Sequence, residues 1–395
     1  MIYVHVPFCR SFCTYCGFYS ELCSRKDPQQ VQNRLFEDYA DALCAEIAAR
    51  QAEICTIRCP ENDSHISFSP DTLYMGGGTP SALPLAVLER IVRALGPADY
   101  EEFTVEVNPD DVVAGGPEYV AGLRGLGVNR VSMGVQSFDD GILRWMNRRH
   151  DAAGAREAFR LLRAGGFDNV SVDLIFGLSQ LSDDQWRDTV SEALALRPEH
   201  ISAYQLSVEE DSALQRMIKD GRYAEASDEQ CRAQYDALCR MLSEAGYVHY
   251  EISNWALPGR EAVHNSAYWR RVPYVGLGPG AHSFASAPGS GGVRSWNSQE
   301  LARRDGAGRL QRWSSGQEVL SPREAAEETV MLGLRTAAGL PLGLLRSLAP
   351  AAPLDALITQ GALSVYTTAG LPGPRVRIPE DHFFVSDDII SLLLP

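Results

Sequence analysis

Apolar residues follow two different periods along the first two thirds of the chain. Short runs rich in β-branched and aromatic residues predict strands, and apolar residues that recur every three or four positions predict amphipathic helices. The expected strands cover residues 2–6, 71–75, 103–107, 130–135, 170–176 and 200–206. The expected helices cover residues 32–51, 85–95, 119–126, 152–164 and 183–196.

Strands and helices alternate in this region, with one unit per roughly 30–35 residues, which predicts right-handed βαβ units and a parallel sheet. Six such units suit an incomplete barrel better than a closed barrel of eight. We therefore expect an α/β fold whose core is a partial (β/α)6 barrel.

The alternation stops after Tyr250. The Gly-, Ser- and Pro-rich residues 285–292 predict a loop or hinge. Helical patterns return from about residue 321, and two β-like stretches at residues 363–367 and 376–379 follow them. Small helices with a β-hairpin resemble a winged-helix module. The expected domains are a barrel core of residues 1–245, an extension of residues 246–320 and a small α+β C-terminal domain of residues 321–395.

Composition narrows the class of protein. Hydrophobic residues make up 45% of the 395 residues and charged residues 22%, which is ordinary for a globular protein. A net charge of -15 argues against nucleic acid as a partner, because such binding depends on neutralising phosphates. The N-terminus has no basic signal-peptide region, and no apolar run reaches the roughly 20 residues of a membrane helix. We expect a cytoplasmic protein without a membrane span.

The first candidate for chemistry is a cysteine loop that follows the first expected strand. Cys9, Cys13 and Cys16 are spaced so that three thiolates can converge on one cubane cluster. A simple electron-transfer [4Fe-4S] centre uses four cysteines, so three leave one iron open. That iron can take the amine and carboxylate of S-adenosylmethionine (SAM), and an electron from the cluster can then break the sulfonium C–S bond. This pattern indicates radical SAM chemistry.

Two other interpretations of these cysteines stay open. Short C-x2-C and C-x3-C spacings also suit a structural zinc site, and disulfides are the second alternative. Among the remaining cysteines, Cys44, Cys231 and Cys239 lie in helical patterns and are expected to be core thiols. Cys55 and Cys59 repeat the C-x3-C spacing in the polar residues 51–70, which we expect to form an insertion loop.

Several polar residues stand at the ends of expected strands, where the chemistry of such barrels gathers. Gly76–Gly78 would let backbone amides approach a ligand closely, or would simply make a tight turn. Glu106 and Asp173 suit an amine or a ribose diol, and Arg148 suits a carboxylate. The alternative is that these charges form ordinary ion pairs at the barrel rim. Gln136 ends another strand.

His264 stands next to Asn265 and close to Tyr268 and Trp269. A neutral imidazole can ligate iron, and the two aromatic rings could lie against a flat macrocycle such as haem. A packed, hydrogen-bonded histidine is the alternative. Three other histidines compete as haem ligands, namely His5, His249 and His282.

Taken together, these motifs resemble the oxygen-independent coproporphyrinogen oxidase family of radical SAM proteins, over essentially the whole chain. The matching segments are residues 5–16, 76–81, 106–109, 132–138, 173–177 and 264–269. The resemblance implies that Cys9, Cys13 and Cys16 hold a [4Fe-4S] cluster. It also implies further cofactor-binding residues: Tyr3, Tyr15, Gly17, Phe18, Gly77, Gly78, Thr79, Glu106, Gln136, Arg148 and Asp173.

The chain departs from the oxidases of that family in two places. The oxidases carry a fourth cysteine two positions after the third, where this chain has Phe18, and a longer extension before the first strand. Both departures point to the haem-chaperone branch of the family, in which the H-N-x-x-Y-W motif binds haem for transfer to an acceptor protein. The resemblance therefore implies His264 as the haem ligand.

Three functions remain open at this stage. The first is a haem chaperone whose partners are haem, an acceptor protein and an electron donor. The second is oxidative decarboxylation of coproporphyrinogen III to protoporphyrinogen IX, which we expect to be absent. The third is a radical SAM methyltransferase or cyclopropanase. Whether the protein is an enzyme at all is left undecided.

Overall fold

The protein is described by a computed structural model that covers residues 1–394, except residues 24–27, 59–70, 288, 302–312, 369 and 371. Its centre is a run of parallel strands whose order in the sheet follows their order in the sequence. These strands are β1 (Ile2–Val6), β4 (Thr72–Gly77), β5 (Glu102–Val107), β6 (Arg130–Gln136), β7 (Val170–Phe176) and β8 (His200–Gln205). The expected α/β fold with six parallel strands is confirmed.

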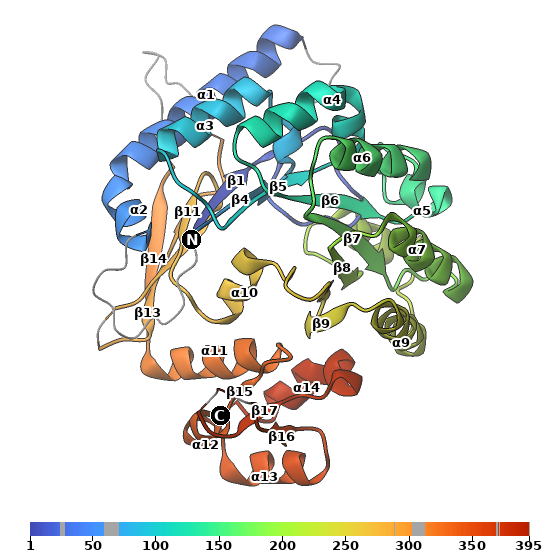
Figure 1. Ribbon diagram of the computed structural model, residues 1–395, viewed down its shortest axis with the longest axis vertical. Helices are drawn as coiled ribbons and strands as arrows, with labels where there is room; N and C mark the ends of the chain where they lie inside the picture. Colours follow the sequence, from blue (N-terminus) through green and yellow to red (C-terminus); the bar gives the residue numbers. More distant parts are fainter. Residues whose placement is uncertain are drawn as a thin grey trace.

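Helices cover the outer side of the curved sheet, and α10 (Val263–Trp269) lies on its inner side (Figure 1). The outer helices are α1 (Gln29–Ala49), α3 (Leu85–Leu95), α4 (Pro109–Gly125), α6 (Ala152–Ala164), α7 (Asp183–Leu196) and α9 (Asp228–Glu244). Several of them begin at strong caps: the Ser182 side chain accepts from Gln185 N–H in a capping box that starts α7. Two shorter helices, α5 (Asp140–Trp145) and α8 (Ala213–Lys219), were not expected.

The sheet is wider than the six expected strands. A short β11 (Val275–Leu277) pairs in parallel with β1, and at the other edge β10 (Asn254–Ala256) and β9 (Val248–Glu251) pair antiparallel. The chain after Tyr250 therefore returns to both edges of the barrel sheet. Strands of three or four residues are too short to show a period in the sequence.

Two expectations about helices were wrong in their bounds. Residues 51–58, expected as part of an insertion loop, form helix α2 (Gln51–Arg58), which carries exposed Cys55; Cys59 lies outside the described residues. Helix α4 begins at Pro109, ten residues before the expected start, and breaks at Gly116, whose φ is 59°. Proline is favourable in a first helical turn, so the Asn108–Pro109 pair is a start signal that the apolar period did not reveal.

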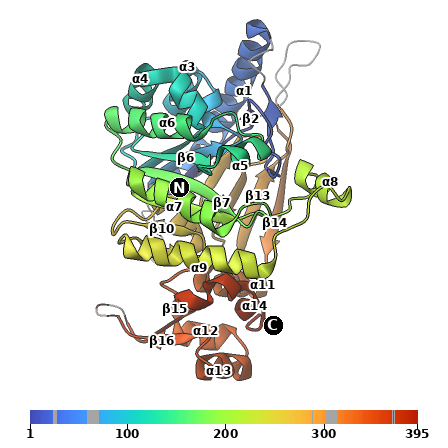
Figure 2. The same ribbon diagram turned by 90° about the vertical axis from the view of Figure 1, so that its right-hand side faces the viewer.

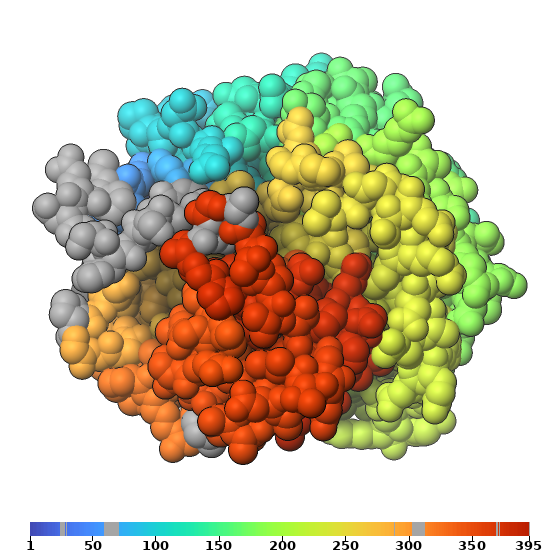
Figure 3. Space-filling view, turned by 60° about the horizontal axis from the view of Figure 1, so that its bottom comes forward, coloured from blue at the N-terminus to red at the C-terminus, as the bar shows by residue number. Residues whose placement is uncertain are grey.

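The remaining strands and helices form two smaller units. A three-stranded antiparallel sheet joins β12 (His282–Ala285), β13 (Gly292–Asn297) and β14 (Ser315–Leu320), and the expected loop connects its first two strands. The C-terminal unit contains α11 (Pro322–Leu334), β15 (Leu340–Pro341), α12 (Leu342–Leu348), α13 (Ala351–Thr359), β16 (Ser364–Tyr366), β17 (Arg375–Arg377), the 3₁₀ helix η2 (Glu380–Val385) and α14 (Ser386–Ser391). It packs against the segment around α9 and β9 (Figures 2 and 3).

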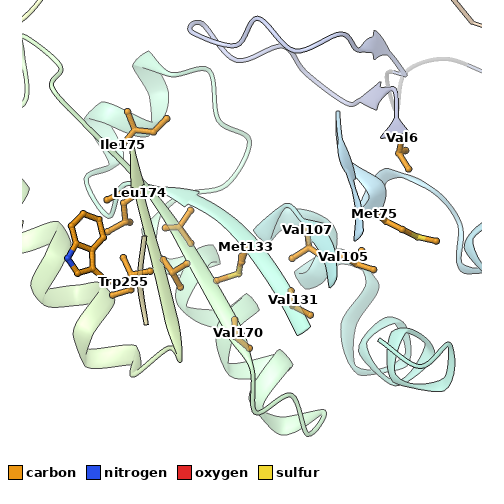
Figure 4. Packing of buried hydrophobic residues seen from close by; sticks show 14 of the residues in the cluster. Val6, Met75, Val105, Val107, Val131, Met133, Val170, Leu174, Ile175 and Trp255 are labelled. Carbon is orange, nitrogen blue, oxygen red and sulfur yellow. The ribbon is translucent and has the colours of Figure 1, made fainter. Parts of the chain in front are cut away.

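The main core lies between the sheet and its outer helices. Strand side chains that point to this side are apolar and fully buried, among them Met75, Val105 and Met133 (Figure 4). Trp255 of β10 closes the core near β7 and is also fully buried. Burial of each such side chain contributes roughly 1.5–3 kcal/mol, so the core holds the strand ends at fixed positions.

Candidate functional site

The cysteine loop follows β1 at the carboxyl end of the sheet. It is held by the short parallel pair β2 (Phe8–Cys9) and β3 (Glu21–Leu22) and by two bonds from Thr14. Thr14 N–H donates to the Met146 carbonyl at 3.1 Å, and its hydroxyl donates to the Trp145 carbonyl at 2.7 Å. The loop is thereby fixed against the end of α5, although its three cysteines are separated by several residues without regular structure.

The spacing of the three thiols bears on the zinc alternative. Among the described residues, the sulfur atoms of Cys9, Cys13 and Cys16 do not form a group whose separations are all below 4.8 Å. A tetrahedral zinc site with Zn–S bonds of about 2.3 Å needs sulfur atoms roughly 3.8 Å apart. As they stand, the three thiols do not form a tetrahedral zinc site. None of the described cysteines forms a disulfide.

The thiols are partly buried, and a basic residue faces them. Burial raises the pKa of Cys9, and burial raises the pKa of Cys16 to about 11. Arg148 Nη1 donates to Cys13 Sγ at 3.3 Å, and the same guanidinium donates to Asn108 Oδ1 and to the Gly134 carbonyl. Its Nε has no partner among the described residues. The buried positive charge favours thiolates, which are the form that binds iron.

The glycine run at the end of β4 packs against β1 and the start of the cysteine loop. Gly77 has φ of +108°, and a Cβ there would lie 2.5 Å from the His5 ring. Gly78 N–H donates to the Val6 carbonyl at 2.8 Å, and a Cβ on Gly78 would lie 2.8 Å from the Phe8 carbonyl oxygen. Glycine is thus required by close packing against β1 and the loop, which gives the tight-turn interpretation a structural basis.

Glu106 lies partly buried near the end of β5, and its carboxylate accepts hydrogen bonds from two donors. Tyr74 hydroxyl donates to Oε1 at 2.8 Å and Gly77 N–H donates to Oε2 at 3.2 Å. Burial raises the pKa of Glu106 to about 7. The hydrogen bond from Tyr74 opposes this rise, and the nearby Asp173 charge adds to it. An acid with this pKa can bind a cationic ammonium group or release it near neutral pH.

Asp173 in the middle of β7 is a second partly buried carboxylate. It accepts from the Ser132 hydroxyl at 3.1 Å and from the Ser171 hydroxyl at 3.3 Å, and burial raises its pKa. Asp173 thus accepts from hydroxyl groups, and Glu106 accepts from a hydroxyl and a backbone N–H, so the rim ion-pair alternative describes neither carboxylate. Gln136 lies nearby, where the pairing of β6 and β7 shifts register, and its φ of 71° is unusual for a residue other than glycine.

The other predicted cofactor residues divide into buried and exposed groups. The Tyr3 hydroxyl forms a hydrogen bond of 3.0 Å with His5 Nδ1, and the Thr79 hydroxyl lies 3.5 Å from Cys9 Sγ. Tyr15 is partly buried within the loop, and a Cβ on Gly17 would lie 2.5 Å from Glu209 Cβ. Phe18 is 74% exposed. The cysteines, the glycine run and Glu106 lie at the carboxyl ends of their strands, whereas Tyr3 is near the start of β1 and Asp173 lies in the middle of β7.

Sequence reasoning missed a layer of polar residues on the inner face of the sheet. They occupy alternate positions on neighbouring strands: Thr72, Tyr74, Glu102, Thr104, Arg130, Ser132, Ser171, His200 and Ser202. Hydrogen bonds link them, as between Ser171 Oγ and His200 Nδ1 at 2.8 Å. The signal was present, because strict alternation of polar and apolar residues within strands predicts two faces with different surroundings.

His264 closes the opposite end of this polar interior. It is 2% exposed, its Nδ1 lies 2.7 Å from Thr72 Oγ1, and its Nε2 lies 3.0 Å from the Tyr268 hydroxyl. Burial, the N-terminal ammonium group and Arg130 lower its pKa to about 3, so the ring is neutral. In this conformation both ring nitrogens are engaged, as the packed-histidine alternative expects. Haem ligation by His264 stays a prediction.

The three competing histidines have different surroundings. His5 is engaged at both ring nitrogens, by Tyr3 hydroxyl and by the Tyr19 carbonyl. His249 is buried against Trp255, whereas His282 is exposed. Of these three residues, His282 alone presents its ring to solvent.

Among the described residues, no helix combines the length and apolar composition needed to span a bilayer. The profile of the Radical SAM superfamily matches residues 62–193. In overall fold the chain is similar to coproporphyrinogen III oxidase (HemN) from Escherichia coli, described as a radical SAM enzyme, with a TM-score of 0.73. The alignment covers 99% of this chain and 89% of HemN at 22% identity.

Relatives named Heme chaperone HemW are more similar in sequence. The protein from Synechocystis sp. is 34% identical, and the alignment covers 86% of this chain and 78% of the relative. The protein from Bacillus subtilis is 33% identical over 86% of this chain and 84% of the relative. The protein from Mycobacterium tuberculosis is 32% identical over 100% of this chain and 94% of the relative. With 32–34% identity over 78–94% of the length of these relatives, the chain belongs to the HemW family of radical SAM proteins.

Proposed function

We propose that this protein is a haem chaperone, which binds haem and transfers it to an acceptor protein. Membership of the HemW family is the observation that carries the proposal. The residue two positions after Cys16 supports it, because Phe18 cannot ligate a metal and points into solvent. Coproporphyrinogen III oxidase activity is not part of the proposal, since the likeness to HemN at 22% identity concerns the fold alone.

The cofactors in this proposal are a [4Fe-4S] cluster on Cys9, Cys13 and Cys16, SAM beside it, and haem. When bound, the cluster and SAM together would supply the components for reductive cleavage of a sulfonium bond, given an electron donor. The position of the three thiols on one loop after β1 and the Arg148 guanidinium at 3.3 Å from Cys13 Sγ support this assignment.

The two partly buried carboxylates have separate roles in SAM binding. Glu106 binds the ammonium group, because its carboxylate is already oriented by Tyr74 and Gly77. Asp173 binds ribose hydroxyls, because its present partners are themselves hydroxyl groups that a diol can replace or join. Charge-assisted bonds of this kind contribute about 1.5–3 kcal/mol each.

Haem in this proposal binds through Nε2 of His264. The bond from Nε2 to Tyr268 must break first, while Thr72 keeps the ring oriented through Nδ1. In a metal-bound histidine, a hydrogen bond to the ring nitrogen that does not bind the metal fixes the tautomer. Haem binding is therefore coupled to an outward movement of Tyr268, which now packs on Tyr274 with ring centroids 4.8 Å apart.

The test uses the anaerobically reconstituted full-length protein. Haem is titrated and followed by Soret absorbance, and the haem-loaded protein is then mixed with a haem-free acceptor whose own spectrum reports transfer. In a separate reaction the protein receives coproporphyrinogen III, SAM and reductant. Stoichiometric haem binding and transfer without decarboxylated product support the proposal. Repeated turnover to protoporphyrinogen IX would identify the protein as an oxidase instead.

A further inference from the structure

A second group of metal-binding side chains lies at the seam between the barrel and the C-terminal unit. Cys239 comes from α9, His249 from β9 and Glu380 from η2, the element directly before α14. Figure 1 shows α9 and β9 above α14. Their nearest ligand atoms all lie within 4.8 Å of one another, and His249 Nδ1 lies 3.0 Å from Glu380 Oε1. None of the three belongs to the cysteine loop or to the polar interior of the barrel.

The two ring nitrogens of His249 have different surroundings. Nε2 lies 3.4 Å from the Ile252 carbonyl oxygen and 3.5 Å from the Tyr235 oxygen, and Tyr235 itself donates to the Ile252 carbonyl at 3.1 Å. Nδ1 makes the shorter contact, at 3.0 Å from Glu380 Oε1. Nδ1 is therefore the ring atom that faces the Glu380 carboxylate.

Without a metal ion, Nδ1 of His249 and the Glu380 carboxylate are at hydrogen-bond distance. A divalent cation would take both as ligands in place of that bond and would also bind Cys239, whose sulfur belongs to the same group. The ring cannot turn away easily, because it stacks on Trp255 with centroids 4.1 Å apart and meets the edge of Phe383 at 4.9 Å.

The residue types select the class of metal. A thiolate, an imidazole and a carboxylate together suit zinc and similar divalent cations, whereas magnesium and calcium prefer oxygen ligands alone. The surrounding bonds also match those of a metal site, since Nε2 of His249 is directed at a backbone carbonyl and Tyr235 can donate to the Cys239 sulfur. The Glu380 side chain is 53% exposed, so the site can be reached from solvent.

We propose that Cys239, His249 and Glu380 form a second metal site, which binds one zinc-type divalent cation and leaves its fourth position open to solvent. Tetrahedral ligands lie roughly 3.3–3.8 Å apart, so the sulfur need move inward by only about 1 Å. The exposed Glu380 side chain can adjust as well. Because the ligands come from α9, β9 and η2, the cation clamps the C-terminal unit onto the barrel.

Cobalt(II) is the probe for this site, because thiolate-bound cobalt has a charge-transfer band. The titration uses full-length protein in which the three cysteines of the cluster loop are replaced by serine, so that they cannot bind the probe. We expect one cobalt per chain with a thiolate band, displaced by zinc. Cys239→Ser should abolish the band and Glu380→Gln should weaken cobalt binding by at least tenfold.

Two matched controls locate the thiolate. Cys231→Ser changes a buried cysteine on the same helix, and Cys55→Ser changes an exposed one on α2. Both variants should keep the full band. A band lost in Cys55→Ser, a band kept in Cys239→Ser or no band at all would overturn the proposal, and the last result would leave only the hydrogen bond between His249 and Glu380. Circular dichroism of Cys239→Ser establishes that the variant is folded.

Discussion

Replacement of Glu106 by glutamine tests the central carboxylate of the proposed SAM site through its effect on stability. The pKa of Glu106 is raised from 4.5 to about 7, mainly by burial. A group whose pKa is raised on folding contributes stability below its unfolded pKa, and that contribution is lost as pH rises through its folded pKa. Wild type should therefore lose stability between about pH 4.5 and pH 7 through this group.

The size of the effect follows from the shift. Each pKa unit corresponds to 1.36 kcal/mol, so a shift of about 2.5 units amounts to about 3 kcal/mol. Glutamine does not titrate, and it also disturbs the bond from Gly77 N–H, which costs about 1–3 kcal/mol at every pH. The informative quantity is thus the difference in the free energy of unfolding, variant minus wild type, which should rise by about 3 kcal/mol from pH 4.5 to pH 8.

Urea unfolding of both proteins across this pH range, without SAM, measures the difference. The matched control is Glu251→Gln, because Glu251 is buried, has a pKa that burial raises to about 7, and accepts from Asn265 of α10 rather than from the glycine run. Both variants should show the same pH trend, and only Glu106→Gln should weaken SAM binding, by tenfold or more above pH 7. A difference that does not change with pH would refute the reasoning about burial. Equal SAM affinity in wild type and Glu106→Gln would refute the site.

The remaining predictions concern the iron-sulfur cluster, haem binding and coproporphyrinogen III. After anaerobic reconstitution, wild type should contain roughly four irons per chain. Alanine substitution of all three cluster-loop cysteines should abolish this iron content and Cys23→Ala should keep it, as measured by iron analysis. His264→Ala should lower haem affinity at least tenfold in Soret titrations, and His282→Ala should not. Tyr268→Phe should raise haem affinity about fivefold, because it removes a bond of about 1 kcal/mol to Nε2; an unchanged affinity would contradict ligation by His264. Anaerobic incubation with coproporphyrinogen III, SAM and reductant should yield no protoporphyrinogen IX, as chromatography of the porphyrins would show.

The sequence determined the barrel because its signals are local. A strand of five to seven residues shows its β-branched composition within its own length, and an amphipathic helix shows its period within three turns. The bounds of β7, α6 and α7 were predicted to the residue for this reason. The cysteine loop was equally visible, since three ligands within eight residues of one another need no tertiary contact to be recognised.

The tertiary structure alone decided which side chains meet. Thr72 and His264 are 192 residues apart and share a hydrogen bond, and His249 reaches Glu380 across 131 residues. No local period carries such information, because the pairing depends on how β4 and α10, or β9 and η2, are brought together by the whole core. The short edge strands were missed for a related reason, since three residues pair only when a longer strand is already beside them. The sequence thus determined where the chain is regular and which residues can react, and packing between distant elements decided that His264 is buried with both ring nitrogens engaged.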